Sequence, residues 1–347
     1  MPTSARPKAT PSAIIVLVLV VSLIGCLPAA WAGALVKSVD MIGMTVANMD
    51  RSVEFFSKVL SFEKISNLEV TGTGSDYERL HGIVGARLRI ARMRLGDEIV
   101  ELTEYLTPRG RTIAADSRSH DHWFQHIAIV VGDMDKAYQR LRAHNVKHTS
   151  FTPQRIPDSN KAAAGIRAFY FKDPDGHDLE LIYFPAGKGK PKWRRINGRL
   201  FLGIDHTAIT VSDTQRSLQF YRDILGMELA GESENHGIEQ DRLNNLSGSR
   251  VRISGLKAEN GPGVEFLHYL APAGGRPMPA DTRANDLWHW QTAMKVNRTG
   301  AAAEKLKAAG IRFVSSAVAK TPDRPSGIHK AFVVRDPDGH GVRLFEQ

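Results

Sequence analysis

Cysteine is almost absent from this chain of 347 residues, since Cys26 is the single one. One cysteine cannot form a disulfide within the chain. It also excludes zinc fingers and dithiol redox motifs, which need several thiolates. Any metal site must therefore be built from His, Asp or Glu side chains.

Acidic residues are missing from the first twelve positions, and the apolar run of residues 13–24 follows them. This run is too short to span a bilayer comfortably and has the length of a signal-peptide hydrophobic region. The triplet AWA at 30–32 is typical of a signal-peptidase site, whereas LIGC at 23–26 is typical of a bacterial lipobox. We expect residues 1–32 to be a signal peptide, with a lipid anchor at Cys26 or an uncleaved anchor as alternatives. Each alternative predicts an exported protein, periplasmic or secreted.

Basic residues also outnumber acidic ones. The chain has 46 Lys and Arg but 37 Asp and Glu, which gives a formal charge of +9. The basic residues are scattered except between residues 185 and 201, which we interpret as a solvated basic linker. No nucleic-acid-binding motif accompanies this cluster, so we expect no nucleic-acid partner.

The sequence repeats itself at long range. The segment that starts at Met41, MIGMTVANMDRSVEFF, matches HTAITVSDTQRSLQFY from His206, and FYFKDPDGHDLELIYF from Phe169 matches FVVRDPDGHGVRLFEQ from Phe332. Residues 37–184 and 202–347 are therefore two copies of one unit.

Each unit is itself divided in two, because its strand-and-helix opening recurs at Gln125 and at Trp290. The sequence thus predicts four modules, each with a strand, a helix and about three further strands. The sequence DPDG before the last strand of the second and fourth modules predicts a hairpin turn. We expect His177 and His340, which end these turns, to be exposed.

A repeated module of this kind that closes with DPDGH resembles the vicinal oxygen chelate superfamily, which includes glyoxalases, bleomycin resistance proteins and extradiol dioxygenases. The resemblance covers nearly all of the chain after residue 37. It implies an α+β fold in which four βαβββ modules form two cupped, open-barrel mixed sheets with helices outside. It also implies a metal ion inside a cup, held by one residue on the first strand and one carboxylate on the last strand of each module.

The internal repeats map these ligand positions onto this chain. The first-strand positions are Met41, His126, His206 and Gln291, and the last-strand positions are Glu101, Glu180, Glu265 and Arg343. The second and third modules keep both ligand types. The first module keeps only Glu101, and the fourth keeps no strong metal ligand. On each first strand, a small residue lies two positions after the ligand position. The two residues share one face of the strand, so the small residue leaves room in a cup.

Modules can share a cup in two ways in this superfamily. Contiguous pairing, first with second and third with fourth, predicts two damaged sites. Crossed pairing predicts one intact site, formed by His126, Glu180, His206 and Glu265, with Glu101 left in the other cup. Losing one ligand relaxes constraint on its partners, so the clustered losses favour crossed pairing. Glu101 becomes a second-tier ligand that matters only under contiguous pairing.

The intact set suits one divalent ion: Zn, Ni, Mn, Co or Fe. The resemblance implies a glyoxalase-like lyase or isomerase acting on a small oxygen-chelating substrate, with Glu180 or Glu265 moving a proton from carbon. The alternatives are a ring-cleaving dioxygenase, which would need contiguous pairing, and a non-catalytic protein that sequesters small molecules. We expect a monomer, because four modules in one chain already supply the interface that two-module relatives form by dimerising.

Overall fold

The computed structural model describes residues 33–70, 76–195, 197–321 and 327–347. The expected signal peptide, with both of its expected processing sites, lies outside the described residues. Within the described part of the chain, no helix is long and apolar enough to cross a membrane.

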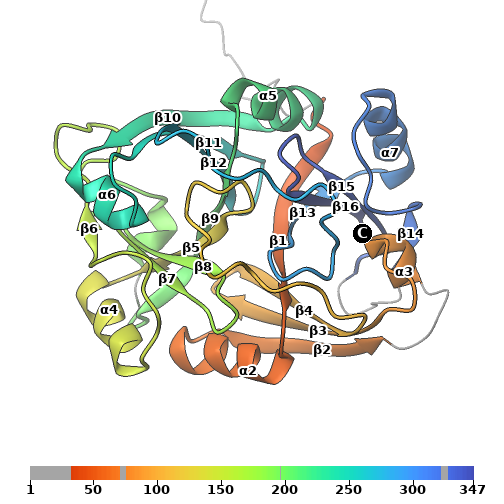
Figure 1. Cartoon of the computed structure of the whole chain (residues 1–347), viewed down its shortest axis with the longest axis horizontal. Coiled ribbons are helices and arrows are strands. Elements are labelled where there is room, and N and C mark those ends of the chain that lie inside the picture. The colour runs from red at the N-terminus through yellow and green to blue at the C-terminus, as the bar shows by residue number, and fades with distance from the viewer. Residues whose placement is uncertain (1–32, 71–75, 196, 322–326) are drawn as a thin grey trace, which may run out of the picture.

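Four modules follow one another along the chain (Figure 1). The first contains β1 (Val36–Val46), α2 (Met49–Glu54), the turn η1 (Phe55–Val59), β2 (Glu63–Val70), α3 (Asp76–His81), β3 (Arg87–Leu95) and β4 (Glu98–Thr107). The second contains β5 (Gln125–Val131), α4 (Met134–Ala143), β6 (Gln154–Arg155), β7 (Arg167–Lys172) and β8 (Asp178–Tyr183). The turn η2 (Pro191–Arg194) separates the two units.

The second unit repeats this order. The third module contains β9 (Phe201–Thr210), α5 (Thr214–Leu218), the turn η3 (Gln219–Ile224), β10 (Glu228–His236), α6 (Ile238–Asn244), β11 (Arg250–Lys257) and β12 (Gly263–Ala271). The fourth contains β13 (Trp290–Val296), α7 (Thr299–Ala308), β14 (Ala319–Lys320), β15 (Lys330–Arg335) and β16 (Gly341–Glu346).

The modules pair crosswise. Sheet A has the strand order β14-β15-β16-β13-β1-β4-β3-β2 and joins the fourth module to the first. Sheet B has the order β10-β11-β12-β9-β5-β8-β7-β6 and joins the third module to the second. Antiparallel pairs, β1 with β13 and β5 with β9, form the two seams. Contiguous pairing is therefore wrong, and each cup, named A or B after its sheet, is made from both units.

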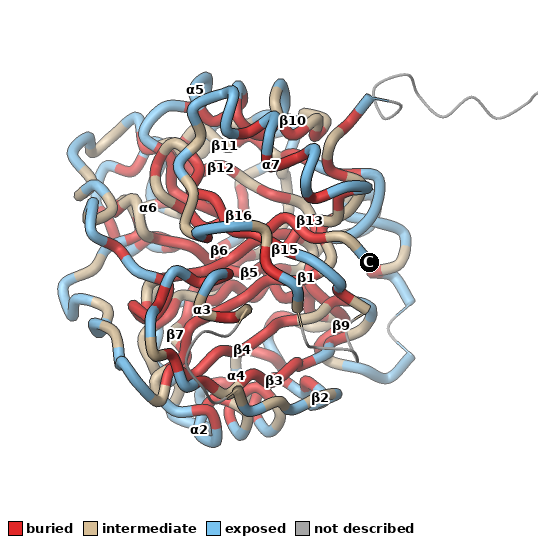
Figure 2. Tube along the Cα trace, turned by 90° about the vertical axis from the view of Figure 1, so that its right-hand side faces the viewer, coloured by how far each residue is buried: buried red, intermediate tan, exposed pale blue. Residues whose placement is uncertain are grey.

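Each strand of the cups alternates between two apolar environments, as its period of two requires. On β1, for example, Ile42 and Met44 face the helices outside the sheet, whereas Met41 packs with residues inside cup A. The outer faces of both sheets and the longer helices share one large core. Figure 2 shows these strands buried and the outer loops exposed.

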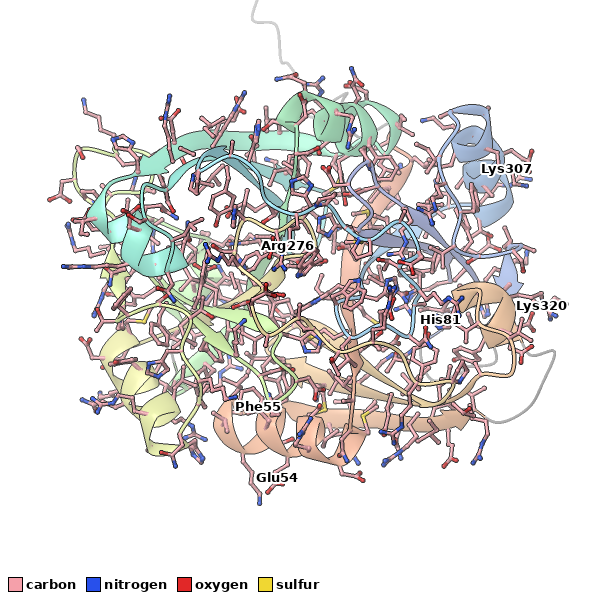
Figure 3. The ribbon with its side chains drawn as sticks, viewed as in Figure 1. Glu54, Phe55, His81, Arg276, Lys307 and Lys320 are labelled. Carbon is pink, nitrogen blue, oxygen red and sulfur yellow. The ribbon has the colours of Figure 1, made fainter. Side chains whose placement is uncertain are left out.

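Two short helices that the sequence did not predict lie across the cups. Helix α3 belongs to the first module but contacts β14 and β15 of the fourth, and α6 of the third module contacts β6 and β7 of the second. Each helix thereby connects the two halves of its cup and brings its last residues toward the concave face. His81 ends α3 (Figure 3), and Asn244 ends α6 at the equivalent repeat position.

The turn histidines are buried, so the expectation that they are exposed is wrong. His177 contacts Asp173 through Nδ1 at 2.8 Å and the carbonyl of Leu287 through Nε2 at 2.6 Å. His340 contacts the carbonyl of Thr210 through Nε2 at 2.9 Å. Each turn therefore packs against the other half of the molecule, His177 against the loop before β13 and His340 against the end of β9, and water does not reach their rings.

The basic linker is more than a solvated tether. Arg194 and Arg195 are exposed, but Trp193 is buried and packs against residues of cup B that include Ala128 and Val130. Trp193 therefore closes one end of cup B.

Candidate metal centre

Two rows of side chains across sheet B bring the four predicted ligands together. In one row Ala208 lies between His126 and Glu265. In the other row Ala128 lies between Glu180 and His206. Strands two apart are separated by roughly 9.5 Å, and His206 and Glu180 reach each other over the small Ala128, with Nε2 and Oε2 3.6 Å apart. A larger side chain in either alanine position would fill the space where they meet.

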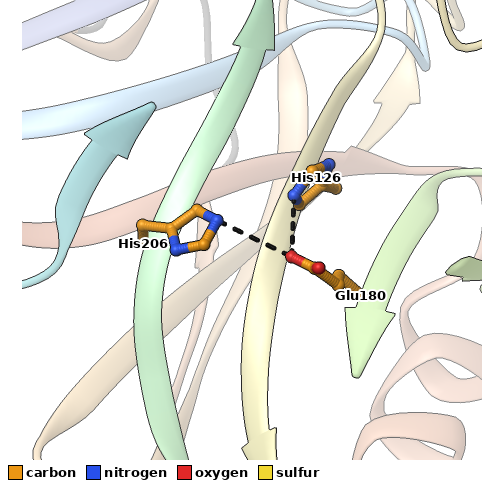
Figure 4. Close-up of side chains that lie close together, drawn as sticks. All are labelled: His126, Glu180 and His206. Carbon is orange, nitrogen blue, oxygen red and sulfur yellow. Dashed lines mark ion pairs between the residues drawn. The ribbon is translucent and has the colours of Figure 1, made fainter. Parts of the chain in front are cut away.

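The imidazoles converge on a carboxylate (Figure 4). Glu180 Oε2 lies 3.1 Å from His126 Nε2 and 3.6 Å from His206 Nε2. Glu265 Oε1 lies 3.6 Å from His206 Nε2. Ligand atoms bound at about 2.1 Å to one ion stand roughly 3.0–3.4 Å apart in octahedral or tetrahedral geometry. The observed separations are close to this range.

The histidine nitrogens that face Glu180 have no competing hydrogen-bond partner among the described residues. Nε2 of His126 and of His206 are buried and accept or donate no hydrogen bond within the described structure. Leaving such atoms unpaired is costly, and a divalent ion would satisfy both nitrogens with the oxygens around them. The donor set of imidazole and carboxylate also suits such an ion. The residues present therefore fit the metal that the fold family implies.

His206 is held from behind by a carboxylate. Its Nδ1 lies 3.2 Å from Asp205 Oδ2, and the other oxygen of Asp205 accepts a hydrogen bond from Trp193 Nε1 at 2.8 Å. Neighbouring residues on a strand normally point to opposite faces, but the pairing register shifts here, between Ile204 and His206. This bulge lets Asp205 and His206 meet. Carboxylates of this kind fix the orientation of metal-binding histidines.

Negative charge dominates the site. Burial would lower the pKa of His206, but Glu265, Asp205 and Glu180 raise it to about 9. Burial raises the pKa of Glu265, and the nearby Glu180 raises it further. Carboxylates in excess over imidazoles favour the binding of a cation, whether proton or metal.

The two predicted proton carriers differ in exposure. The Glu180 side chain is 7% exposed and contacts both histidines, whereas that of Glu265 is 24% exposed and lies near His206 alone. Glu265 is therefore the freer of the two to move, a distinction that the near-symmetric sequence pattern could not make.

A small cavity of about 100 Å³ opens beside these carboxylates. Its wall combines apolar side chains with neutral polar ones, among them Asn235, Gln240, Asn244 and Tyr269. Both side-chain polar atoms of Asn244 and Gln240 Oε1 have no hydrogen-bond partner among the described residues. No lysine or arginine belongs to the described residues that line the cavity.

Cup A holds an ion pair in the corresponding place. Arg343 Nη1 donates to Glu101 Oε1 at 2.6 Å, and Arg92 donates to Glu101 Oε2 at 2.8 and 3.0 Å. Burial would raise the pKa of Glu101, but Arg343 and Arg92 lower it to about 2. Both carboxylate oxygens are thus occupied by guanidinium groups. The structure separates Glu101 from the four ligand candidates in cup B and gives it a different partner.

Sequence reasoning missed Asp205, Trp193 and the residues of α6. The acid directly before His206 was visible in the sequence, but strand alternation places it on the wrong face unless a bulge is known. Trp193 gave no signal, because its partner comes from outside the linker.

A second group of possible ligand atoms, from Asp173, Asp175 and His177, is accounted for by the turn itself. Asp173 Oδ1 accepts from the backbone N–H of Asp175 and His177, and Asp175 Oδ2 accepts from Ala47 N. These hydrogen bonds stabilise the turn and its contact with the first module.

The comparisons with known proteins agree with this architecture. The model of the Glyoxalase/Bleomycin resistance protein/Dioxygenase superfamily matches residues 38–181 and 203–344. A 2-epi-5-epi-valiolone epimerase from an Actinomyces species is 36% identical over 152 residues, covering 43% of this chain and 81% of that protein. Glyoxalase I of Saccharomyces cerevisiae is 32% identical over 112 residues, covering 32% of this chain and 30% of that protein.

Solved structures show the same fold. The crystal structure of glyoxalase I from Zea mays superposes with a TM-score of 0.56 at 17% identity, covering 89% of this chain and 92% of that one. A putative dioxygenase from Bacillus subtilis superposes with a TM-score of 0.53 at 16% identity, covering 90% and 86%. At such identities the likeness concerns the fold alone.

Proposed function

Because the chain belongs to the Glyoxalase/Bleomycin resistance protein/Dioxygenase superfamily, we propose that cup B is the active site of a metal-dependent lyase or isomerase. The observation that carries the proposal is the convergence of His126, Glu180 and His206 on one buried point, with Glu265 Oε1 3.6 Å from His206 Nε2. A divalent ion bound there would act as a Lewis acid on a substrate that chelates it through two adjacent oxygens.

The side chains of this chain would divide the work. His126, His206 and Glu180 are the least exposed of the four and hold the ion in place. Glu265 is the most exposed and moves the proton to and from the carbon beside a carbonyl group. Asp205 keeps His206 in the orientation that binding needs. A relative named as an epimerase supports this, since epimerisation removes and returns such a proton.

The cavity favours a small, uncharged, hydroxylated substrate. Its unpaired groups include the amide of Asn244 and the amide oxygen of Gln240, and Tyr269 adds a hydroxyl; such groups hydrogen-bond to hydroxyls as donors or acceptors. A substrate with several carboxylates would need cationic partners, which the described lining of the cavity does not contain.

The test is proton exchange at carbon. The metal-reconstituted chain would be incubated with dihydroxyacetone in D2O, and loss of the C–H signals would be followed by NMR. We expect metal-dependent exchange that Glu265→Gln slows at least 100-fold. Glu101→Gln is the matched control and should leave the rate unchanged. Exchange that survives Glu265→Gln would contradict the role given to this carboxylate, and binding without exchange would favour sequestration.

Ring-cleaving dioxygenation is a second candidate because the three closest side chains, His126, Glu180 and His206, are two histidines and one carboxylate. Non-haem iron oxygenases use this set. Sheet B is not built by the contiguous pairing that this alternative needs, and Glu265 adds a further carboxylate 3.6 Å from His206 Nε2. Oxygen uptake by the iron-loaded chain with catechol would favour the dioxygenase over the lyase or isomerase.

We also propose that the protein is exported and acts outside the cytoplasm. The support is the apolar run at residues 13–24 and the two processing motifs after it. Cell fractionation with mass spectrometry of the mature N-terminus tests this. A start after Ala32 indicates secretion, a lipidated Cys26 indicates an anchor, and an unprocessed cytoplasmic chain would contradict export.

A further inference from the structure

Cup A carries a buried arginine in place of a metal ligand. Arg343 stands at the repeat position of Glu180 and is 5% exposed. In sheet A, Ala293 lies between Arg343 and Met41, and Gly43 lies between Gln291 and Glu101. The small residues that leave room in cup B are therefore kept here, although the ligands are not.

One edge of the Arg343 guanidinium is unused. Nη1 donates to Glu101, but Nε and Nη2 are buried and have no partner among the described residues. Nε and Nη2 lie on the same side of the group, and their parallel N–H bonds match the two oxygens of a carboxylate. Arg92 uses this same edge to hold Glu101.

Three neutral groups in this cup are also unpaired. The Tyr105 hydroxyl, His81 Nε2 and Gln291 Oε1 are buried and make no hydrogen bond within the described part of the chain. Gln291 lies close to His81, with Nε2 3.3 Å from its Nδ1. Burial and the charge of Arg343 lower the pKa of His81 to about 4, so the ring is neutral near pH 7. Together these atoms offer hydrogen bonds to a hydroxyl beside a carboxylate.

A cavity lies beside this neighbourhood, although Arg343, Tyr105, His81 and Gln291 are not among its described lining residues. A cavity of about 870 Å³ is lined by Met41, Arg92 and Phe345, which face the inside of cup A, and by Lys190 and Lys192 of the linker. Phe345 is two residues after Arg343 on the same strand and so shares its face. Trp193 closes the linker end of cup B, whereas the corresponding end of cup A is open.

We propose that cup A binds a small hydroxycarboxylate without a metal ion. Its carboxylate pairs with Nε and Nη2 of Arg343, and its hydroxyl bonds to Tyr105, Gln291 or His81. Apolar Met41 and Phe345 limit the ligand to a short carbon chain. The site is independent of the metal centre proposed for cup B.

Glycolate is the probe, and glycolamide is its neutral isostere. Thermal unfolding and isothermal titration of the whole chain should show binding of glycolate but not of glycolamide. Arg343→Met should weaken glycolate binding at least tenfold, and Tyr105→Phe about fivefold. Because glycolate can also chelate a metal ion, the titration is repeated with His206→Ala, which should leave this binding unchanged.

Three results would overturn the proposal: equal affinity for glycolate in the wild type and in Arg343→Met, loss of binding in His206→Ala, or binding of inorganic phosphate in preference to glycolate. Arg343→Met removes a partner of buried Glu101 and can fail to fold. Tyr105→Phe breaks no hydrogen bond seen here, so it keeps the test decisive. If the cup held no ligand, glycolate would raise the unfolding temperature of neither the wild type nor this variant.

Discussion

At the scale of single residues, the proposed metal centre would depend on groups that hold the ligands as well as on the ligands themselves. Trp193 donates to Asp205, and Asp205 contacts His206, so an indole from the linker influences an imidazole in the cup. When a hydrogen-bond partner of a metal-binding histidine is removed, metal affinity commonly falls tenfold to a hundredfold.

We expect Trp193→Phe to lower metal affinity about tenfold while the ion still binds. The reason is that Asp205 loses its fixing hydrogen bond and His206 becomes less ordered. Competition with a chelator of known affinity measures the change. Trp288→Phe is the matched control. The Trp288 indole also donates one hydrogen bond, to Thr282, but it belongs to the loop before β13 and makes no contact with Asp205 or His206 among the described hydrogen bonds. Equal affinity in Trp193→Phe and the wild type would show that this chain of contacts does not position His206.

A buried neutral histidine makes the fold sensitive to acid. His81 is 2% exposed, and burial with the nearby Arg343 lowers its pKa to about 4, against 6.5 when unfolded. Between these values the unfolded chain binds a proton that the folded chain does not. The free energy of unfolding therefore falls as the pH falls from about 6.5 to about 4, by roughly 3 kcal/mol for this residue.

Urea unfolding at a series of pH values measures this effect. His81→Asn copies the residue at the equivalent position of α6, Asn244, and should flatten the pH profile in that window. His236→Asn changes an exposed histidine and serves as the control. A wild-type stability that is constant from pH 6.5 to 4 would contradict the buried neutral state of His81.

The sequence predicted which ligand-type residues occur at equivalent repeat positions, and the structure brings His126, Glu180 and His206 together, with Glu265 beside His206. It could not predict Asp205, because a β-bulge is needed for adjacent residues to share a face. It also failed for His177 and His340. Alternation along one strand carries no information about a turn that is covered by another sheet.

At the scale of elements, the helices that follow the first strand of each module (α2, α4, α5 and α7) begin at equivalent positions, but only three of these four have a side-chain cap. Asn48, Asp133 and Asp213 each accept a hydrogen bond from the backbone N–H three residues on. Arg298 has the same extended backbone at this position in the fourth module but makes no such bond. It also places a positive charge at a helix N-terminus, which is unfavourable.

We expect Arg298→Asn to raise the free energy of unfolding by about 1 kcal/mol, because it restores the cap. Asn is preferred to Asp here, since Glu346 already accepts from Thr299 at the start of this helix. Urea denaturation measures the gain, and Asn48→Ala should show a loss of similar size. No gain in Arg298→Asn would mean that Glu346 already satisfies the start of α7.

The repeats predicted the first strand and helix of each module well, because periods of 3.6 and 2 are both visible there. They did not predict α3 and α6. These helices have six and seven residues, too few to separate a helical period from a loop. Their role comes from contacts with the partner module, which a local pattern does not contain.

At the scale of the whole molecule, neither unit contains a complete sheet. The seams β1–β13 and β5–β9 join strands from opposite halves of the chain. His177 and His340 add buried contacts between the two units, to the carbonyls of Leu287 and Thr210. The clustered loss of ligands in the sequence favoured this pairing, but the connectors between modules were too similar in length to decide it.

We expect the chain to stay together after cleavage in its linker. A protease site inserted between Ala186 and Gly187, both exposed, would be cut without breaking either seam. The cut protein should elute in gel filtration at the mass of one intact chain, because two eight-stranded sheets hold the halves. Denaturing electrophoresis confirms the cut. Two separate half-mass species under native conditions would contradict crossed pairing in solution.

Metal content most directly tests the central claim that His126, Glu180, His206 and Glu265 hold one ion in cup B. Elemental analysis of the purified chain should give about one divalent ion per molecule. His206→Ala should lose it, whereas Glu101→Gln, which changes the carboxylate already paired with Arg343 and Arg92, should keep it. An ion that persists in His206→Ala and is lost in Glu101→Gln would contradict the account.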